Sequence, residues 1–242
     1  MSAASAAAVK VSTLYEVPPL APETQSARVV PDYAQTAVRT PTRFQRRPRT
    51  LSELTGPQDL THRLAVLGSD IAGHGEKQAI GQLIHVKLKV VDEDGSPVAG
   101  TLVEMWQANA AGRYTHPNDD DHAPVDQCFH GAARVQTNES GEIDIRTIRP
   151  GAYPVPTTKG WWRPAHIHFS VWGKVWLSRV VTQMFFPDDM LNAQDRILMA
   201  VPQAAAREGL ICRMRPTDEG PSNALVYEHR IVVRGRNATA QV

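Results

Sequence analysis

Two histidines separated by one residue are the side chains in this chain whose spacing first suggests chemistry. His166 and His168 lie in the run Ala-His-Ile-His-Phe-Ser-Val-Trp, which follows Pro164 and is typical of a β-strand. Because side chains on a strand alternate between its faces, both imidazoles project from the same face. Neutral imidazole is the commonest metal ligand in proteins. The pair alone fits a metal site or ordinary polar packing, so the rest of the chain must decide between them.

Two tyrosines lie in loops that contain glycine and proline and that lead toward this strand. Tyr114 belongs to a long irregular stretch at 107–127, and Tyr153 belongs to Pro-Gly-Ala-Tyr-Pro at 150–154. Long loops in compact domains are usually functional or disordered. Taken singly, each tyrosine is better explained as a loop anchor with its hydroxyl at the surface. Arg163, taken singly, is better explained by a structural ion pair.

The composition narrows the classes of function. Hydrophobic residues make up 42% of the 242 residues, enough for a full core, and the formal net charge of +1 gives no indication of nucleic acid or an anionic membrane. Two cysteines, Cys128 and Cys212, are too few for a secreted disulfide framework and fit a reducing cytoplasm. No apolar run approaches the length of a membrane span, and the N-terminus lacks the pattern of a signal peptide. We therefore expect a cytoplasmic protein.

The elements that position these residues are predicted to be short strands. With 18 prolines and 16 glycines the chain turns often, which favours strands over long helices. The predicted strands cover residues 83–90, 101–106, 132–137, 142–148, 165–172, 180–186 and 225–234. The third and fourth are predicted to form a hairpin around the turn Asn138–Gly141. About seven short strands separated by turns indicate an all-β fold, an antiparallel β-sandwich with long loops.

Two further segments flank this sandwich pattern. One helical insertion is predicted near 188–209, capped by an aspartate at its start and divided by Pro202. Residues 1–60 show no period and contain seven prolines, so we expect an extended N-terminal arm followed by one domain at 61–242. The basic run at 43–49 fits an anion or nucleic-acid patch, but the near-zero net charge favours a solvated loop or a subunit contact.

Four segments taken together resemble the intradiol ring-cleaving dioxygenases. They are Glu-Met-Trp-Gln-Ala-Asn at 104–109, Gly-Arg-Tyr at 112–114, Pro-Gly-Ala-Tyr-Pro at 150–154 and Arg-Pro-Ala-His-Ile-His-Phe at 163–169. Their order and spacing match the family, and the resemblance covers roughly residues 30–236. Within the family the chain looks most like the iron-binding β subunits of the enzymes that act on protocatechuate.

The resemblance implies a non-haem iron(III) held by Tyr114, Tyr153, His166 and His168. The chemistry of these donors agrees, because phenolate oxygen is a hard anionic ligand that suits a hard, highly charged ion. A bound cation also favours the anion of tyrosine, so ligation would deprotonate both phenols. By the same resemblance, Tyr153 leaves the metal when a catechol binds, whereas Tyr114 stays.

The resemblance also assigns roles around this ligand set. Arg163 would stabilise negative charge that develops on the substrate ring, and Gln183 would lie beside it among the catalytic residues. Trp106, Ile197 and the arm residue Tyr33 would contact the substrate. For Trp106 and Ile197, core packing is nearly as well supported as substrate contact.

The implied reaction is cleavage of a para-substituted catechol by dioxygen to a substituted cis,cis-muconate. Protocatechuate and 4-sulfocatechol are both candidate substrates, because Val155 stands where the family's β subunits usually have an aromatic residue. The resemblance further implies a homologous α subunit that forms an αβ protomer in a larger oligomer.

Three other functions compete with this interpretation. A catechol or hydroxyquinol 1,2-dioxygenase would carry a helical dimerisation domain at its N-terminus, and residues 1–60 have no helical period. A zinc or copper protein that uses His166 and His168 would leave Tyr114 and Tyr153 unexplained. A non-catalytic sandwich subunit would not be expected to retain all four ligand types.

Overall fold

The structure is a computed structural model that describes residues 20–31, 33, 36, 40, 68–74, 77–119, 122–156, 158–172, 179–216 and 223–242. The basic run at 43–49 lies outside the described residues. The described residues of 1–60, the predicted arm, include a short 3₁₀ helix, η2 (Pro22–Thr24), and form hydrogen bonds with distant parts of the chain. The backbone N–H of Ala21 donates to the Arg236 carbonyl at 3.3 Å, and that of Ala27 donates to the Ala200 carbonyl at 2.9 Å.

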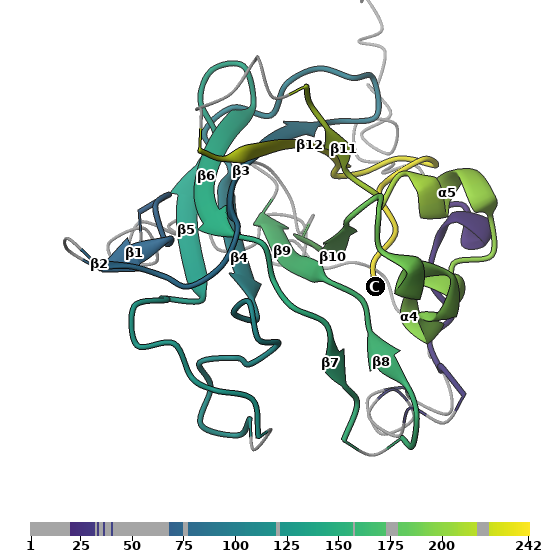
Figure 1. The fold of residues 1–242 in the computed structure, drawn as a ribbon. Coiled ribbons are helices and arrows are strands. Elements are labelled where there is room, and N and C mark those ends of the chain that lie inside the picture. The colour runs from purple at the N-terminus through teal and green to yellow at the C-terminus, as the bar shows by residue number, and fades with distance from the viewer. Residues whose placement is uncertain are drawn as a thin grey trace, which may run out of the picture.

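Two four-stranded sheets form the described part of the domain (Figure 1). The β9 sheet has the order β10-β9-β4-β5, and the β3 sheet has the order β11-β12-β3-β6. The β9 sheet consists of β4 (Leu102–Gln107), β5 (Ala132–Gln136), β9 (His166–Trp172) and β10 (Arg179–Phe185). The β3 sheet consists of β3 (Leu83–Val91), β6 (Glu142–Ile148), β11 (Arg213–Met214) and β12 (Leu225–Val232). The predicted all-β sandwich is therefore confirmed.

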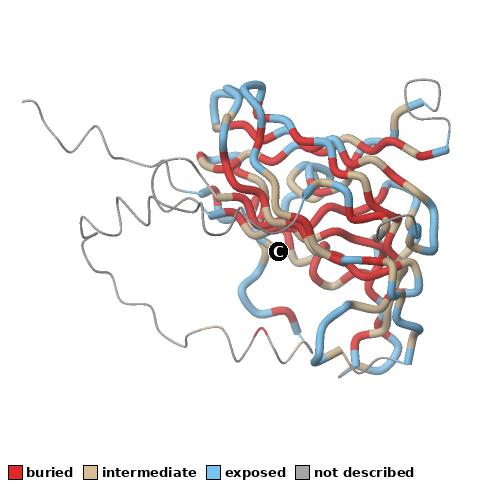
Figure 2. Tube along the Cα trace, turned by 90° about the vertical axis from the view of Figure 1, so that its left-hand side faces the viewer, coloured by how far each residue is buried: buried red, intermediate tan, exposed pale blue. Residues whose placement is uncertain are grey.

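Apolar side chains on the facing sides of the two sheets make the core. Val86 and Ile145 from the β3 sheet and Ile167 and Phe169 from the β9 sheet belong to one buried cluster. The buried stretches run side by side through the sheets, while the turns are exposed (Figure 2). Since residues alternate along β9, its histidines project from the side of the sheet that faces away from this core.

The turn at Asn138–Gly141 does not close a hairpin, so that prediction is wrong. β5 pairs with β4 in the β9 sheet, whereas β6 pairs with β3 in the other sheet. The Asn138 carboxamide accepts from the N–H groups of Ser140 and Glu142, at 2.9 Å each, and Gly141 has a φ of 71°. The turn therefore has the expected chemistry, but it carries the chain from one layer of the sandwich to the other.

One strand pair departs from the antiparallel arrangement. β12 lies parallel to β3, with Leu225 opposite Ile84 and Val232 opposite Val91. A parallel neighbour requires a long crossover rather than a tight turn. β3 ends at Val91 and β12 begins at Leu225, so the other strands of both sheets and the helical segments lie between them in the sequence.

The helical insertion consists of three short pieces, η3 (Met190–Gln194), α4 (Arg196–Met199) and α5 (Ala204–Glu208). Asp189 caps the first piece by accepting from Leu191 N, and Pro202 separates the last two, as predicted. Two short pairs complete the fold, β1 (Gly73–His74) with β2 (Lys77–Gln78) and β7 (Tyr153–Pro154) with β8 (Trp162–Arg163). The β7–β8 pair lies at the lower edge of the molecule, below α4, in Figure 1.

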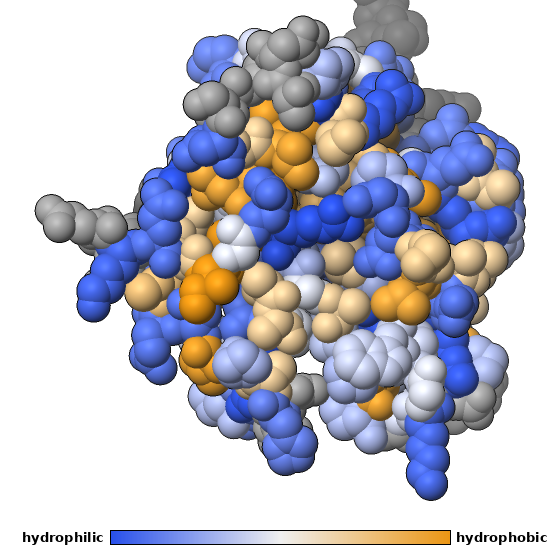
Figure 3. Space-filling view, in the orientation of Figure 1, coloured by the Kyte–Doolittle hydropathy of each residue, from blue (hydrophilic) through white to orange (hydrophobic). Residues whose placement is uncertain are grey.

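The face seen in Figure 3 is mostly hydrophilic, with small separate apolar patches. Several large apolar side chains of the described residues are exposed, among them Ile80, Val125, Trp162 and Met190. Among the described residues, no helix has both the length and the apolar character that crossing a membrane requires.

Candidate metal centre

Four polar side-chain atoms from three parts of the chain converge on one point. Tyr114 Oη lies 3.0 Å from His168 Nε2, and Tyr153 Oη lies 3.3 Å from His166 Nε2. The two imidazole Nε2 atoms are 3.2 Å apart, and the two phenol oxygens are 3.5 Å apart. The structure thus brings together the four residues that the sequence predicts as metal ligands.

His166 is fixed at the start of β9 by its backbone surroundings. Its Nδ1 lies 2.7 Å from the Pro164 carbonyl, which cannot donate, so the ring N–H is on Nδ1 and donates to that oxygen. The lone pair of the neutral ring is then on Nε2, the atom that faces the other three donors. The start of the strand is held by Asp189, whose carboxylate accepts from Ala165 N at 2.8 Å.

The neighbouring strands hold His168 from both sides. On β4, Trp106 is directly opposite His168, and its ring stacks on the imidazole with centroids 4.9 Å apart and an interplanar angle of 6°. On β10, Gln183 is opposite His168 and Phe185 is opposite His166. Trp106, predicted to contact substrate, therefore packs against a candidate ligand and fixes the orientation of its ring.

The loops that carry the two tyrosines are joined to each other by Asn109. The Asn109 carboxamide oxygen accepts from the N–H groups of Ala111 and Arg113, at 2.9 and 3.0 Å. The backbone carbonyl oxygen of Asn109 accepts from Gly112 N at 3.0 Å and from Gly151 N, in the Tyr153 loop, at 2.9 Å. One residue therefore shapes the Tyr114 loop and attaches the second loop to it.

Gly112 makes the close approach of these loops possible. It has a φ of 87°, which L side chains rarely adopt, and an added Cβ would lie 2.4 Å from the Ala152 carbonyl oxygen. Two residues later, Tyr114 N donates to the Asp119 carboxylate at 2.7 Å. These contacts set the position of the Tyr114 ring before any ligand is bound.

Burial keeps all four groups uncharged in the absence of a cation. It raises the pKa of Tyr114 well above the ordinary value, with a further increase from the neighbouring Tyr153, and burial also raises the pKa of Tyr153. Burial and the nearby Arg163 charge lower the pKa of His166 well below its ordinary value and that of His168 to about 3. Both imidazoles are therefore unprotonated at neutral pH, in the form that binds metal ions.

Arg163 is buried beside this cluster in an ion pair. Its Nε donates to the Asp195 carboxylate, and one terminal nitrogen donates to the Gln183 side-chain oxygen. The side chains of Arg163 and Asp195 are 3% and 0% exposed. The other Asp195 oxygen accepts from Ile197 N and Leu198 N at 3.0 and 2.7 Å and so caps α4. One carboxylate thus links a helix N-terminus to the guanidinium.

The remaining predicted site residues lie in an adjoining apolar cluster. Ile197 is buried against Val155 and Trp161, and the partly buried Tyr33 packs on them. Tyr33 meets the Trp161 ring edge-on, with centroids 5.4 Å apart. The arm residue is thus brought to the domain next to β7, although it precedes that strand by more than a hundred residues.

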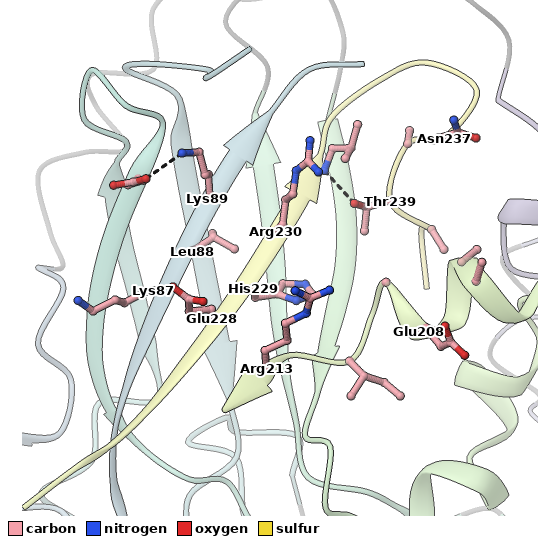
Figure 4. Close-up of a pocket in the computed structure, with 18 of the residues that line it drawn as sticks. Lys87, Leu88, Lys89, Glu208, Arg213, Glu228, His229, Arg230, Asn237 and Thr239 are labelled. Carbon is pink, nitrogen blue, oxygen red and sulfur yellow. Dashed lines mark hydrogen bonds and ion pairs between the residues drawn. The ribbon is translucent and has the colours of Figure 1, made fainter. Parts of the chain in front are cut away.

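A groove of about 860 Å³ elsewhere on the molecule contains none of these residues. It lies between the outer face of the β3 sheet and α5, and charged side chains from several strands line it (Figure 4). The Lys89 ammonium pairs with Glu142 at 3.0 Å, and Arg215 pairs with Glu228. The candidate chemistry is therefore on the opposite layer of the sandwich from this groove.

Sequence reasoning missed the residues that position the predicted ones. Asp195 directly precedes Arg-Ile-Leu-Met, and an aspartate before such a run is typical of a helix N-cap. The sequence could therefore have predicted its capping role. Asn109 lies just before a turn, and an asparagine at such a position typically accepts hydrogen bonds from nearby backbone N–H groups with its side chain. Neither pattern indicates that the residue also contacts a segment distant in the sequence.

The four donors fit a single metal ion. Donor atoms about 2.1 Å from one ion lie about 3.0–3.4 Å apart, depending on the angle between them. The four distances between neighbouring donor atoms of these side chains are 3.0–3.5 Å and correspond to this spacing. Among the described residues, no group of three or more His, Cys, Asp or Glu side chains is arranged to hold a metal, and here the tyrosines complete the donor set.

Comparison with known proteins places the chain and its fold in one family. A family model described as Dioxygenase matches residues 54–235. The protocatechuate 3,4-dioxygenase beta chain of Burkholderia cepacia is 45% identical over 220 residues, which cover 88% of this chain and 92% of that one. The protocatechuate 3,4-dioxygenase alpha chain of Pseudomonas putida is 26% identical, covering 76% and 83%. An intradiol ring-cleavage dioxygenase from Tetranychus urticae, at 20% identity, shares the fold with a TM-score of 0.54 and covers 73% and 92%.

The chain belongs to the intradiol ring-cleaving dioxygenases, a family that uses non-haem iron. Within that family it is a homologue of the protocatechuate 3,4-dioxygenase beta chain. The predicted family and enzyme class are confirmed.

Proposed function

We propose that the chain is the iron-binding subunit of an intradiol dioxygenase that cleaves a para-substituted catechol with dioxygen. The substrate is protocatechuate or a close analogue such as 4-sulfocatechol, and the product is a substituted cis,cis-muconate. The observation that carries the proposal is the convergence of two phenol oxygens and two imidazole nitrogens, with neighbouring atoms 3.0–3.5 Å apart. The similarity to a beta chain over most of both sequences supports the substrate class.

Tyr114, Tyr153, His166 and His168 would hold a ferric ion. Two phenolates and two neutral imidazoles offset much of its charge, so the centre can be buried at modest electrostatic cost. When bound, iron(III) would supply Lewis acidity, which lowers the pKa of the catechol hydroxyls and favours the dianion.

The residues of this chain perform the proton transfer and the charge stabilisation. Tyr153 Oη, as a phenolate, would accept the proton of one substrate hydroxyl, and a hydroxide from solvent would accept the proton of the other. Arg163 provides a fixed positive charge for the negative charge that develops on the ring. Gln183 and Asp195 orient the guanidinium through direct hydrogen bonds, so no reorganisation is needed during the reaction.

The visible spectrum of the purified protein tests this function. A ferric ion with two phenolate ligands is expected to give a wine-red solution through ligand-to-metal charge transfer. Tyr153→Phe is expected to keep a weaker, shifted band while turnover falls at least about 100-fold, the lower end of general acid–base effects. Tyr227→Phe, a buried tyrosine in the core, is the matched control and should keep both the colour and the rate. A colourless protein with a full complement of iron contradicts the ligand assignment.

The substrate range is decided by kinetics on a small set of catechols. The proposal expects a higher kcat/KM for protocatechuate or 4-sulfocatechol than for catechol or hydroxyquinol. The reverse order would instead support the alternative, a catechol or hydroxyquinol 1,2-dioxygenase.

We propose that residues 1–60 form an extended arm, that residues 61–242 form the catalytic domain, and that a homologous α subunit completes an αβ protomer in a larger oligomer. The similarity to both a beta and an alpha chain supports such a pairing. The described residues Ala21 and Ala27 are held by hydrogen bonds to the carbonyls of Arg236 and Ala200.

Co-expression with the homologous α chain tests this assembly. We expect the two chains to purify together in a large complex, with a higher kcat than the β chain expressed alone. Deletion of residues 1–19 is a matched variant that shortens the arm and leaves the described residues intact. Full activity from a monomeric β chain would contradict the proposed protomer.

A further inference from the structure

An apolar cluster borders the candidate metal centre along the β7–β8 pair. Val155, Trp161 and Ile197 are 7%, 4% and 8% exposed, and Tyr33 packs against them. Among the three buried residues of this cluster, Val155, Trp161 and Ile197, the indole of Trp161 is the largest side chain.

The strand register places this cluster on the same face as the candidate catalytic residues. Tyr153 is opposite Arg163, and Val155 N donates to the Trp161 carbonyl at 2.9 Å, which extends the same antiparallel pairing by one step. Side chains two residues apart on a strand share a face. Val155 therefore lies beside Tyr153, and Trp161 lies beside Arg163, on the face of the strand pair that carries these two candidate catalytic residues.

Among the described residues, the indole N–H of Trp161 has no acceptor. Trp161 Nε1 is buried, and none of the described residues provides a hydrogen-bond partner for it. Buried indole N–H groups usually find a partner, and an unsatisfied one is destabilising. A donor held without an acceptor beside a substrate site is explained if the substrate supplies the acceptor.

The surroundings of Trp161 favour a negatively charged acceptor. The Arg196 guanidinium lies over the indole ring, 5.2 Å from its centroid, and contributes positive charge at the edge of the cluster. The Tyr33 ring meets the indole edge-on and restrains it. Apolar walls with an indole N–H donor and a nearby cation suit a group that has acceptor oxygens on an aromatic ring.

We propose that Trp161 is a specificity-determining residue that donates its indole N–H to an anionic substituent on the catechol ring. The substituent class is an oxyanion, either carboxylate or sulfonate, packed between Val155 and Ile197. This inference rests on the proposed function, since it needs a catechol bound at the metal centre.

The test compares kcat/KM for protocatechuate and 4-sulfocatechol with that for 4-methylcatechol in the iron-loaded, purified assembly. Trp161→Phe keeps an aromatic ring but removes the N–H donor together with part of the volume of the indole. We expect the preference for the anionic substrates to fall about tenfold or more, as for loss of a hydrogen bond to a charged group. Trp162→Phe, the same change at the exposed neighbour on the other face of β8, should leave the preference unchanged.

The possible outcomes separate this inference from the function on which it rests. A Trp161→Phe protein with an unchanged preference, or with all three substrates slowed equally, overturns the role of Trp161. If that variant does not fold, Arg196→Gln replaces it, and an unchanged preference there overturns the anionic subsite. A wild-type protein that cleaves no catechol overturns the proposed function. One that cleaves catechols without preferring anionic ones overturns this inference and the proposed substrate range, but leaves intradiol cleavage itself in place.

Discussion

His168→Ala is expected to produce a folded protein that purifies without stoichiometric iron and without activity. The substitution removes one of four donors and leaves the face of Trp106 without the imidazole that it stacks on. Loss of an outer partner of a metal ligand already lowers metal affinity about 10–100-fold, so loss of a direct ligand should exceed about 100-fold. Metal analysis of the purified protein, together with its visible spectrum, measures the effect.

His85→Ala is the matched control for this experiment. His85 is also on a strand, but it is in the β3 sheet, where it pairs with Asp144 at 2.8 Å. It should retain the iron content and the activity of the unmodified protein. Undiminished iron in His168→Ala would remove His168 from the ligand set.

Asp195→Ala is expected to cause the largest loss of stability among single changes at this site. It leaves the Arg163 guanidinium buried without its counter-charge, which typically costs about 3–5 kcal/mol. It also removes the cap of α4, worth about 1 kcal/mol. Denaturant unfolding at fixed metal content measures the change in the free energy of unfolding.

Two variants separate the charge effect from the cap. Asp189→Ala removes the cap of η3 and the acceptor for Ala165 N but strands no buried cation, so its loss should be smaller. Arg163→Met combined with Asp195→Ala leaves no charge unpaired and should recover part of the stability. If Asp195→Ala lowers the free energy of unfolding no more than Asp189→Ala does, the ion pair of Asp195 with Arg163 does not contribute to stability beyond the helix cap.

Local patterns in the sequence predicted the strands, but not how the strands pair. The alternation around Ile167 and Phe169 predicted both the β9 strand and the shared face of its histidines. The turn at Asn138–Gly141 was also recognised, yet its residues specify only that the chain reverses and not which strand it meets next. The parallel pairing of β3 with β12 depends on a crossover between segments far apart in the sequence.

The candidate site likewise contains some features that the sequence predicted and others that depend on the fold. Tyr114 and Tyr153 were found because their spacing matches a known family, a signal carried by the chain itself. The stacking of Trp106 on His168 depends on the register of β4 against β9. The ion pair of Asp195 with Arg163 joins residues on different elements. Such contacts exist only after the sheets have formed, so spacing along the chain does not indicate them.

The joining of the two tyrosine loops by Asn109 has a consequence for the thermodynamics of metal uptake. Because Asn109 and Gly112 already hold the phenols close to β9, little conformational entropy remains to be lost when an ion binds. The metal then connects two pre-ordered loops to the sheet, and a ligand that binds only the native state stabilises it by mass action. The unfolding temperature of this protein should therefore rise with free iron concentration, so that thermal stability reports the occupancy of the centre.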